Sequence, residues 1–248
     1  MSGYWLAIDT ATDIASVAAG RRAASAAPHP ESGAHVQGSR RHAAEIVRLI
    51  DFALTRVGVR PADLGGIVVG DGPGSFTGLR IGWAAAKGLA QEGGLDLVAI
   101  PSLLAAAAGA AVRVGPAPVA ACFDALRGQV YGALYCIQSE RVETLVAPAV
   151  MTFEEFMHRA PEPPQLVVGD GAIRYATAAR SWSGTAPVAP QDLPPAATML
   201  LSLLSHEGAG RVIDTPTAEP VYGRPAEAQA KWEAHHGRPL PSPTRRSG

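Results

Sequence analysis

A glycine-rich stretch that follows an apolar run is the feature that most constrains the fold of this chain. The run Gly66–Val69 predicts a buried strand, and the residues from Thr77 to Gln91 predict a helix of mostly small side chains. Between them lies the stretch 70–82, which reads GDGPGSFTGLRIG. A glycine-rich turn between a strand and a helix allows close approach of a second backbone or a ligand, and the first free N–H groups of the helix point toward it. The stretch therefore predicts either a ligand-binding edge or a point of very close packing.

The glycine-rich stretch matches neither of two common phosphate-binding motifs. A Walker loop closes with Gly-Lys-Ser or Gly-Lys-Thr, whereas Lys87 lies well inside the predicted helix. The dinucleotide-binding fingerprint is interrupted by Pro73, and no acidic residue follows at the end of the next predicted strand. Neither motif therefore predicts a nucleotide site here.

Length and composition limit the class of protein. The chain has 248 residues, 47% of them hydrophobic and 17% charged, which is enough for one large domain or two small ones with a buried core. The net charge of −1 argues against binding of nucleic acid by charge alone, because neutralising phosphates requires a clustered basic surface. Cys122 and Cys136 are expected to be buried, reduced thiols. Without a visible secretory leader or long apolar segment, we expect a soluble cytoplasmic protein that is not bound to a membrane.

The chain before the glycine-rich stretch predicts a β-hairpin. Tyr4–Asp9 and Ile14–Ala19 are apolar runs joined by a polar turn, with Asp9 and Thr10 at its tip. These two residue types are favoured in turns, and they also suit a phosphate or metal site such as that of actin-like ATPases. Both interpretations stay open on the sequence alone.

The region that follows is rich in Ala, Pro, Gly and Ser and has poor hydrophobic periodicity. Over residues 21–41 we expect at most a short third strand. His29 and His35 are then expected in exposed loops rather than among ligands.

Two predicted helices are expected to pack on more than one neighbour. The helix His42–Val57 carries an apolar arc at helical spacing, and Phe52 projects from its otherwise polar side. His42 is interpreted as a surface or interface residue, because Ile46 stands where a paired ligand would be. The helix from Thr77 has a second face of small residues, and glycine inside a helix costs about 1 kcal/mol relative to alanine, which implies a gain from close approach. The candidates for a partner interface are His42, Phe52, Ile81, Ala84, Ala85 and Gly88.

The rest of the chain repeats the pattern of its beginning. The strand Leu95–Ile100 and an alanine-rich helix capped by Ser102 complete the element order of a ribonuclease-H-like unit. A second hairpin, Val119–Phe123 with Gln129–Ile137, then starts the pattern again around the turn Asp124–Gly128. Further predicted elements are the helix Thr152–Arg159, the strand Leu166–Val168, a helix opened by residues 169–172 and the helix Ala196–His206.

Several segments together resemble the TsaB (YeaZ) family in order and spacing. The resemblance covers about residues 4 to 225, and its most specific part is the glycine-rich motif with Phe76-Thr-Gly-Leu-Arg80. The other segments are Ala7–Thr12, Arg41–Glu45, Phe123–Tyr131, Val168–Ala172 and Glu219–Tyr222.

The resemblance implies an α/β protein with the actin-like ATPase (ASKHA) fold, made of two ribonuclease-H-like halves with mixed sheets flanked by helices. The halves are expected at residues 1–101 and 102–222, followed by a partly disordered tail at 223–248. It also implies a non-catalytic scaffold and dimerisation subunit that binds TsaD and, with it, the ATPase TsaE. This complex transfers a threonylcarbamoyl group to adenosine 37 of tRNA, and the chain is expected to meet tRNA only through the complex. In isolation, the surface that binds TsaD could instead form a homodimer.

The sequence departs from the catalytic paralogue where chemistry would require otherwise. TsaD proteins carry a His-x-x-x-His metal pair at positions that correspond here to Ser102 and Ala106. The second phosphate-contacting turn corresponds to Asp124–Gly128, whose carboxylate would repel phosphate. The resemblance thus implies no catalytic residue, no metal and no cofactor bound by this chain alone, with ATP or ADP only at the interface of the complex.

The alternative is an enzyme in its own right. A stand-alone ATPase, a sugar-kinase-like phosphotransferase or an M22-type peptidase would each suit the wider group of folds. A peptidase needs a metal pair or an activated nucleophile, and Ser75 has no His–Asp arrangement nearby in the sequence. The residues expected at the glycine-rich turn, as a candidate ligand edge, are Asp9, Thr10, Gly72, Gly74, Ser75, Phe76, Thr77 and Arg80.

Overall fold

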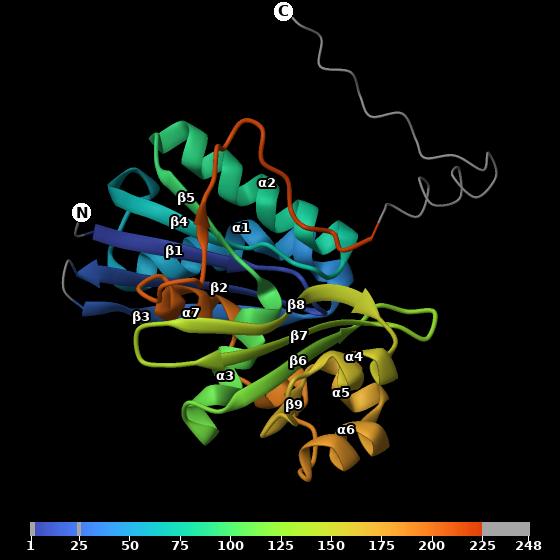
Figure 1. Cartoon of the computed structure of the whole chain (residues 1–248). Helices are drawn as coiled ribbons and strands as arrows, with labels where there is room; N and C mark the ends of the chain where they lie inside the picture. Colours follow the sequence, from blue (N-terminus) through green and yellow to red (C-terminus); the bar gives the residue numbers. More distant parts are fainter. Residues whose placement is uncertain (1–2, 24–25, 225–248) are drawn as a thin grey trace, which may run out of the picture.

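The structure is a computed structural model that describes residues 3–23 and 26–224 (Figure 1). Most of the tail expected at 223–248 lies outside the described residues. Two mixed β-sheets, each flanked by helices, form the molecule. None of the described helices is both long enough and apolar enough to cross a membrane.

The first sheet has six strands in the order β10-β5-β4-β1-β2-β3. β1, β2 and β3 pair antiparallel, β4 and β5 run parallel to β1, and β10 closes the edge antiparallel to β5. The central strands are continuous apolar runs because both of their faces are covered. The bounds are β1 Gly3–Asp9, β2 Ile14–Ala23, β3 Ala26–Gln37, β4 Leu64–Gly70, β5 Asp96–Ile100 and β10 Arg211–Val212.

Helices cover both faces of this sheet. Leu6 and Ile8 of β1 pack toward α1 (His42–Val57) and α2 (Phe76–Gly93), and the alternate residues Trp5 and Ala7 pack toward α3 (Ser102–Val114) and α7 (Ala196–Leu203). This alternation is the period-two pattern of a strand buried on both sides. Both long helices predicted in this half are confirmed, and each ends at a left-handed glycine, Gly58 or Gly94.

The expectation of at most a short strand in residues 21–41 requires correction. β3 spans Ala26–Gln37 and pairs along most of β2, and His29 and His35 are exposed residues of this strand rather than of loops. The pairing register shifts between Ala19 and Gly20, next to the position opposite Pro30. An edge strand that accommodates proline at an irregularity lacks the apolar alternation by which strands are recognised, so its length was underestimated.

The second sheet repeats the beginning of the first. Its order β8-β7-β6-β9 has antiparallel β6, β7 and β8, with β9 parallel to β6, just as β3, β2, β1 and β4 are arranged. The bounds are β6 Pro118–Asp124, β7 Val130–Ile137, β8 Val142–Met151 and β9 Leu166–Val168. This repeat confirms two mixed sheets in ribonuclease-H-like order. β8 was not predicted, because its buried and exposed residues do not alternate regularly.

Three short helices lie on the outer face of the second sheet: α4 (Phe153–Arg159), α5 (Asp170–Arg174) and α6 (Ala176–Ser183). Thr152 caps α4 by accepting a hydrogen bond from the amide of Glu155 at 3.1 Å, as predicted. The three-residue 3₁₀ turns are η1 (Ser39–Arg41), η2 (Pro61–Asp63) and η3 (Pro190–Asp192).

α3 lies between the two sheets and is buried along most of its length. The expectation that Ser102 caps this helix is wrong. Pro101 is the cap residue and makes no side-chain cap bond, while Ser102 is the first helical residue and its hydroxyl is used elsewhere. Cys122 is buried and Cys136 is only partly buried, and both are free.

The chain returns to its first half near the end of the described residues. After α7, β10 joins the first sheet and residues 213–224 run over α2 (Figure 1). A division of the chain at residue 101 stays a prediction, and the structure adds that residues 196–224 pack on the first sheet and its helices. Strand pairing over such a long separation leaves no local signal in the sequence.

Candidate functional site

The glycine-rich stretch packs against the turn between β1 and β2. A Cβ atom added at Gly74 would overlap the carbonyl oxygen of Ala11, and one added at Gly78 would overlap that of Thr10. The amide of Ser75 donates to the carbonyl of Ala11 at 2.7 Å, and the hydroxyl of Thr10 donates to the carbonyl of Gly78 at 2.7 Å. Of the two interpretations offered by the sequence, very close packing of two backbones is therefore realised.

Asp9 lies under this contact and is almost fully buried, with 1% of its surface exposed. Its Oδ1 accepts a hydrogen bond from the amide of Ala11 at 3.1 Å, and its Oδ2 accepts one from the hydroxyl of Ser102 at 2.6 Å. The Ser102 hydroxyl in turn accepts from the amide of Gly72 at 3.3 Å. Burial raises the pKa of Asp9, and the bond from Ser102 opposes that rise. The carboxylate thus joins the first hairpin, the glycine-rich stretch and α3.

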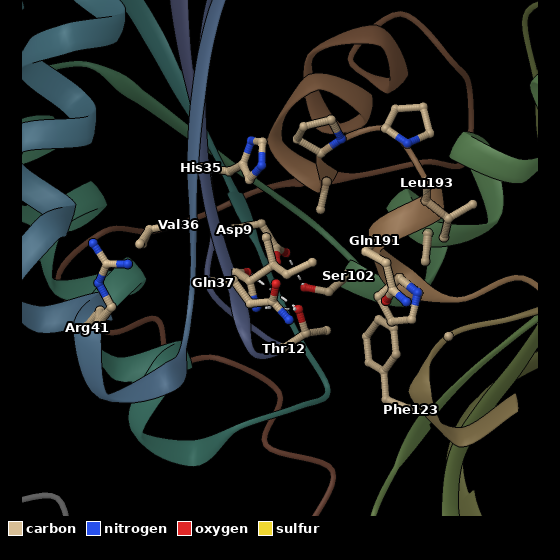
Figure 2. Close-up of a pocket in the computed structure, with 17 residues that line it drawn as sticks. Asp9, Thr12, His35, Val36, Gln37, Arg41, Ser102, Phe123, Gln191 and Leu193 are labelled. Carbon is tan, nitrogen blue, oxygen red and sulfur yellow. Dashed lines mark hydrogen bonds between the residues drawn. The ribbon is translucent and has the colours of Figure 1, made fainter. Parts of the chain in front are cut away.

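A cavity of about 420 Å³ lies above this carboxylate, between the two halves (Figure 2). Asp9, Thr12 and Gln37 form one side of it, and Phe123 and Gln191 form the other. Ser102 and Ala106, which the family resemblance places at the positions of the TsaD histidine pair, both line this cavity.

These two positions supply no ligand for a metal ion. A hydroxyl already bonded to Asp9 and a methyl group offer no ligand in place of two imidazoles. Among residues 3–23 and 26–224, no three His, Cys, Asp or Glu side chains gather as a ligand set. The expectation of no metal stays a prediction, since the sequence also continues outside these residues.

A second cleft, of about 690 Å³, lies between the turns of the two hairpins. Gly74, Ser75 and Phe76 line one part of it, so the glycine-rich stretch faces this cleft as well as the first hairpin. The remaining lining comes from the first turn, from the turn Asp124–Gly128 and from the last described residues, Tyr222 and Arg224.

Both acidic and basic side chains line this second cleft. Asp124 pairs with Arg174 at 2.7 Å and also accepts from the amide of Leu126 at 2.9 Å. Burial raises the pKa of Asp170, whose Oδ1 accepts from the amide of Asp124 at 3.0 Å. Asp13 also lines the cleft, as do Arg127 and Arg224, so the charged lining is mixed in sign.

The end of the described chain holds the glycine-rich stretch from outside. Arg211 pairs with the buried carboxylate of Asp71 at 2.8 Å, and the amide of Val221 donates to the carbonyl of Asp71 at 2.9 Å. The ring of Tyr222 packs on Phe76 at 4.6 Å between centroids, and its hydroxyl accepts from Nε of Arg80 at 3.2 Å. Sequence reasoning missed Asp71, Arg211 and Tyr222 as partners, although the Glu219–Tyr222 segment carries part of the family resemblance.

Of the predicted interface residues, His42 requires correction. It is fully buried, with 0% of its surface exposed, and its Nε2 lies 3.3 Å from the carbonyl oxygen of Asp13. His42 begins α1 beneath the first hairpin turn, so it supports that turn and cannot meet a partner directly. The helical pattern gave no sign of this, because the contact depends on where the hairpin folds back.

The other interface candidates lie on two neighbouring helices. α1 and α2 pack against each other on the same face of the first sheet. Phe52 is 50% exposed, Ala84 and Gly88 are exposed, and Ile81 and Ala85 are partly buried against the core. Val47 is also exposed. We call the set Val47, Phe52, Ala84 and Gly88 the helix surface.

The duplicated topology and the cleft between the halves define the class of this protein as an actin-like ATPase fold. Comparison with solved structures agrees: YeaZ from Pseudomonas aeruginosa matches with a TM-score of 0.68 and 26% identity, covering 88% of this chain and 100% of that one. A family described as TsaD, tRNA N6-adenosine threonylcarbamoyltransferase, matches residues 35–186.

Relatives that match over most of their length make the family specific. The tRNA threonylcarbamoyladenosine biosynthesis protein TsaB of Escherichia coli is 32% identical over 227 residues, covering 88% of this chain and 94% of that protein. The TsaB protein of Bacillus subtilis is 31% identical over 199 residues, covering 77% and 83%. The chain belongs to the TsaB family, whose members are named for the biosynthesis of threonylcarbamoyladenosine in tRNA.

Proposed function

We propose that this chain is a non-catalytic scaffold subunit that binds TsaD and, with it, TsaE. The assembled complex would transfer the threonylcarbamoyl group to adenosine 37 of tRNA, and the chain would reach tRNA only through that complex. Its relatives are named for this biosynthesis, and the family that matches residues 35–186 is that of the transferase itself. A subunit and a catalytic partner of homologous fold can pair through equivalent surfaces.

The observation that carries the proposal is that exposed apolar or small residues lie on both of the neighbouring helices α1 and α2. Phe52 and Val47 are apolar side chains that are exposed and contribute nothing to the buried core. A Cβ atom added at Gly88 would meet nothing within 4 Å, so this glycine serves no contact inside the chain. Small residues on α2 would let a second helix pair approach closely and form a four-helix bundle. An isolated chain would cover the same surface by pairing with a second copy.

We further propose that the isolated chain binds neither metal nor nucleotide. The proposal is supported by the Ser102 hydroxyl that is bonded to Asp9 and by the turn Asp124–Gly128, which places a carboxylate and two bulky side chains in the second cleft. ATP or ADP would then bind only where the partner supplies the missing groups. Elemental analysis after purification without chelators, and calorimetric titration with ATP and magnesium, test both statements.

The docking proposal is tested by placing one charge on the helix surface. Ala84→Glu would bury an unpaired carboxylate at the helix contact and weaken binding of TsaD by several kcal/mol, about a hundredfold or more. Ala84 is exposed in the isolated chain, so the melting temperature of the Ala84→Glu variant should equal that of the wild type. Ala176→Glu, on the exposed start of α6 in the other half, is the matched control with the same charge.

Binding of purified TsaD and sedimentation of the isolated chain are the measurements. We expect Ala84→Glu to lose both the partner and any homodimer, and Ala176→Glu to keep both. Wild-type affinity for TsaD in the Ala84→Glu variant would place the docking surface elsewhere.

A further inference from the structure

The turn between β6 and β7 holds two ordinary residues in a conformation that favours glycine. Leu126 has φ of 60° and Arg127 has φ of 51°, and Gly128 follows with φ of 79°. Side chains with a Cβ atom adopt the left-handed region at a steric cost, and asparagine or glycine are the usual residues there. Leu126 and Arg127 therefore lower the stability of the turn relative to asparagine or glycine at these positions.

The turn is nevertheless held rigidly. The amide of Ala125 donates to the carbonyl of Gln129 at 3.0 Å, and the amide of Gln129 donates to the carbonyl of Leu126 at 2.9 Å. Asp124 fixes one side through the Leu126 amide and through Arg174. Gln129 fixes the other side by accepting a hydrogen bond from Arg224 of the last described segment. The tip is thus presented in one geometry, with little ordering left to occur on binding.

Neither side chain at the tip contributes to the protein's own packing. Leu126 is 64% exposed and belongs to none of the buried clusters. Arg127 is exposed, and within the described part of the chain it makes no salt bridge. A strained backbone that presents an apolar side chain and a free guanidinium serves no purpose that the isolated chain reveals.

We propose that Leu126 and Arg127 form a second docking element, the turn knob, for a protein partner that offers an apolar pocket bordered by carboxylates. Leucine would fill the pocket, and the guanidinium would pair with a carboxylate at its rim. A nucleic acid suits this element poorly, because phosphates require a clustered basic surface, and the neighbouring Arg174 and Arg224 are already bonded to Asp124 and Gln129. The turn knob belongs to the second half of the chain and the helix surface to the first. The turn knob rests on the proposed function only in that its partner belongs to the same assembly.

The test is the double variant Leu126→Asn with Arg127→Gly. Asparagine and glycine suit the left-handed conformation, so the melting temperature should stay the same or rise. Loss of binding then cannot be explained by loss of folding. Ile173→Asn, which removes another exposed apolar side chain of the second half, is the matched control.

Purified TsaD and TsaE are titrated with each variant, and the rate of threonylcarbamoyladenosine formation is measured with all subunits present. We expect affinity for one of the two proteins, or for their preformed complex, to fall at least about tenfold in the double variant and not in the control. Wild-type affinities and a wild-type rate in the double variant would contradict the proposal that Leu126 and Arg127 form a docking element. A loss confined to tRNA binding by the assembled complex would overturn its assignment to a protein partner. Loss of TsaD in Ala84→Glu is scored separately, so failure of either proposal is recognised by itself.

Discussion

The two halves of this molecule use corresponding hairpin turns in opposite ways. The turn between β1 and β2 is buried under the glycine-rich stretch, and every polar group of Asp9 is satisfied within the chain. The corresponding turn between β6 and β7 is exposed, strained and free of such a cover. The same topology thus gives one turn that locks the core and one that presents side chains outward. Substitutions at the first turn should therefore cost stability, and those at the second should change binding.

The largest effect is expected where the two backbones touch. Gly78→Val should destabilise the protein by about 1–3 kcal/mol, because the added side chain would overlap the carbonyl oxygen of Thr10. Gly88 in the same helix faces open space, so Gly88→Ala should instead stabilise by about 0.5–1 kcal/mol through helix propensity. Urea denaturation of both variants measures the contrast. Equal stability of Gly78→Val and the wild type would mean that the first turn is an ordinary loop.

The next effect concerns the carboxylate beneath the first turn. Ser102→Ala removes a bond that lowers the pKa of Asp9, so the folded-state pKa, already raised by burial, rises further. The unfolded chain releases this proton near the ordinary pKa of about 3.9, while the folded variant keeps it to a higher pH. Stability of the variant therefore falls as the pH rises through that window, and at pH 7 we expect a deficit smaller than that of Gly78→Val.

The measurement for Ser102→Ala is urea denaturation at about pH 4.5 and pH 7.5, with the wild type alongside. The deficit should be larger at the higher pH, since only there must the folded variant hold an ionised Asp9 without its partner. A deficit that is the same at both values would show that Ser102 acts by packing rather than through the carboxylate.

The smallest effect on stability is expected at the second turn. Arg174→Met removes the partner of Asp124, but the guanidinium is half exposed and the pair is screened by solvent. Thermal unfolding should show a shift well below that of Ser102→Ala, while the fixed geometry of the turn knob loosens and its partner dissociates faster. A large loss of stability would instead make the second turn as much a part of the core as the first.

Much of the fold could be predicted from local patterns. The apolar run of β4, the arc of α1, the cap of α4 and the restart of the pattern at β6 are all properties of consecutive residues, and the structure confirms them. Periodicity reports a residue's own helix or strand, so it identifies these elements well. The motifs of the glycine-rich stretch and the hairpins were sufficient to indicate the family.

The contacts between residues far apart in the sequence were decided only by the tertiary structure. The sequence offered two interpretations of the glycine-rich stretch, and the choice depended on the Ala11 and Thr10 carbonyls that fold against it. His42 is buried because the first hairpin turn lies over it, and Asp71 is paired because β10 returns from the end of the chain. Such contacts join residues far apart in sequence, and each contributes too little to any local pattern to be recognised there. Helices and strands follow from nearby side chains, whereas burial, ion pairing and the strain at Leu126 follow from how those elements pack.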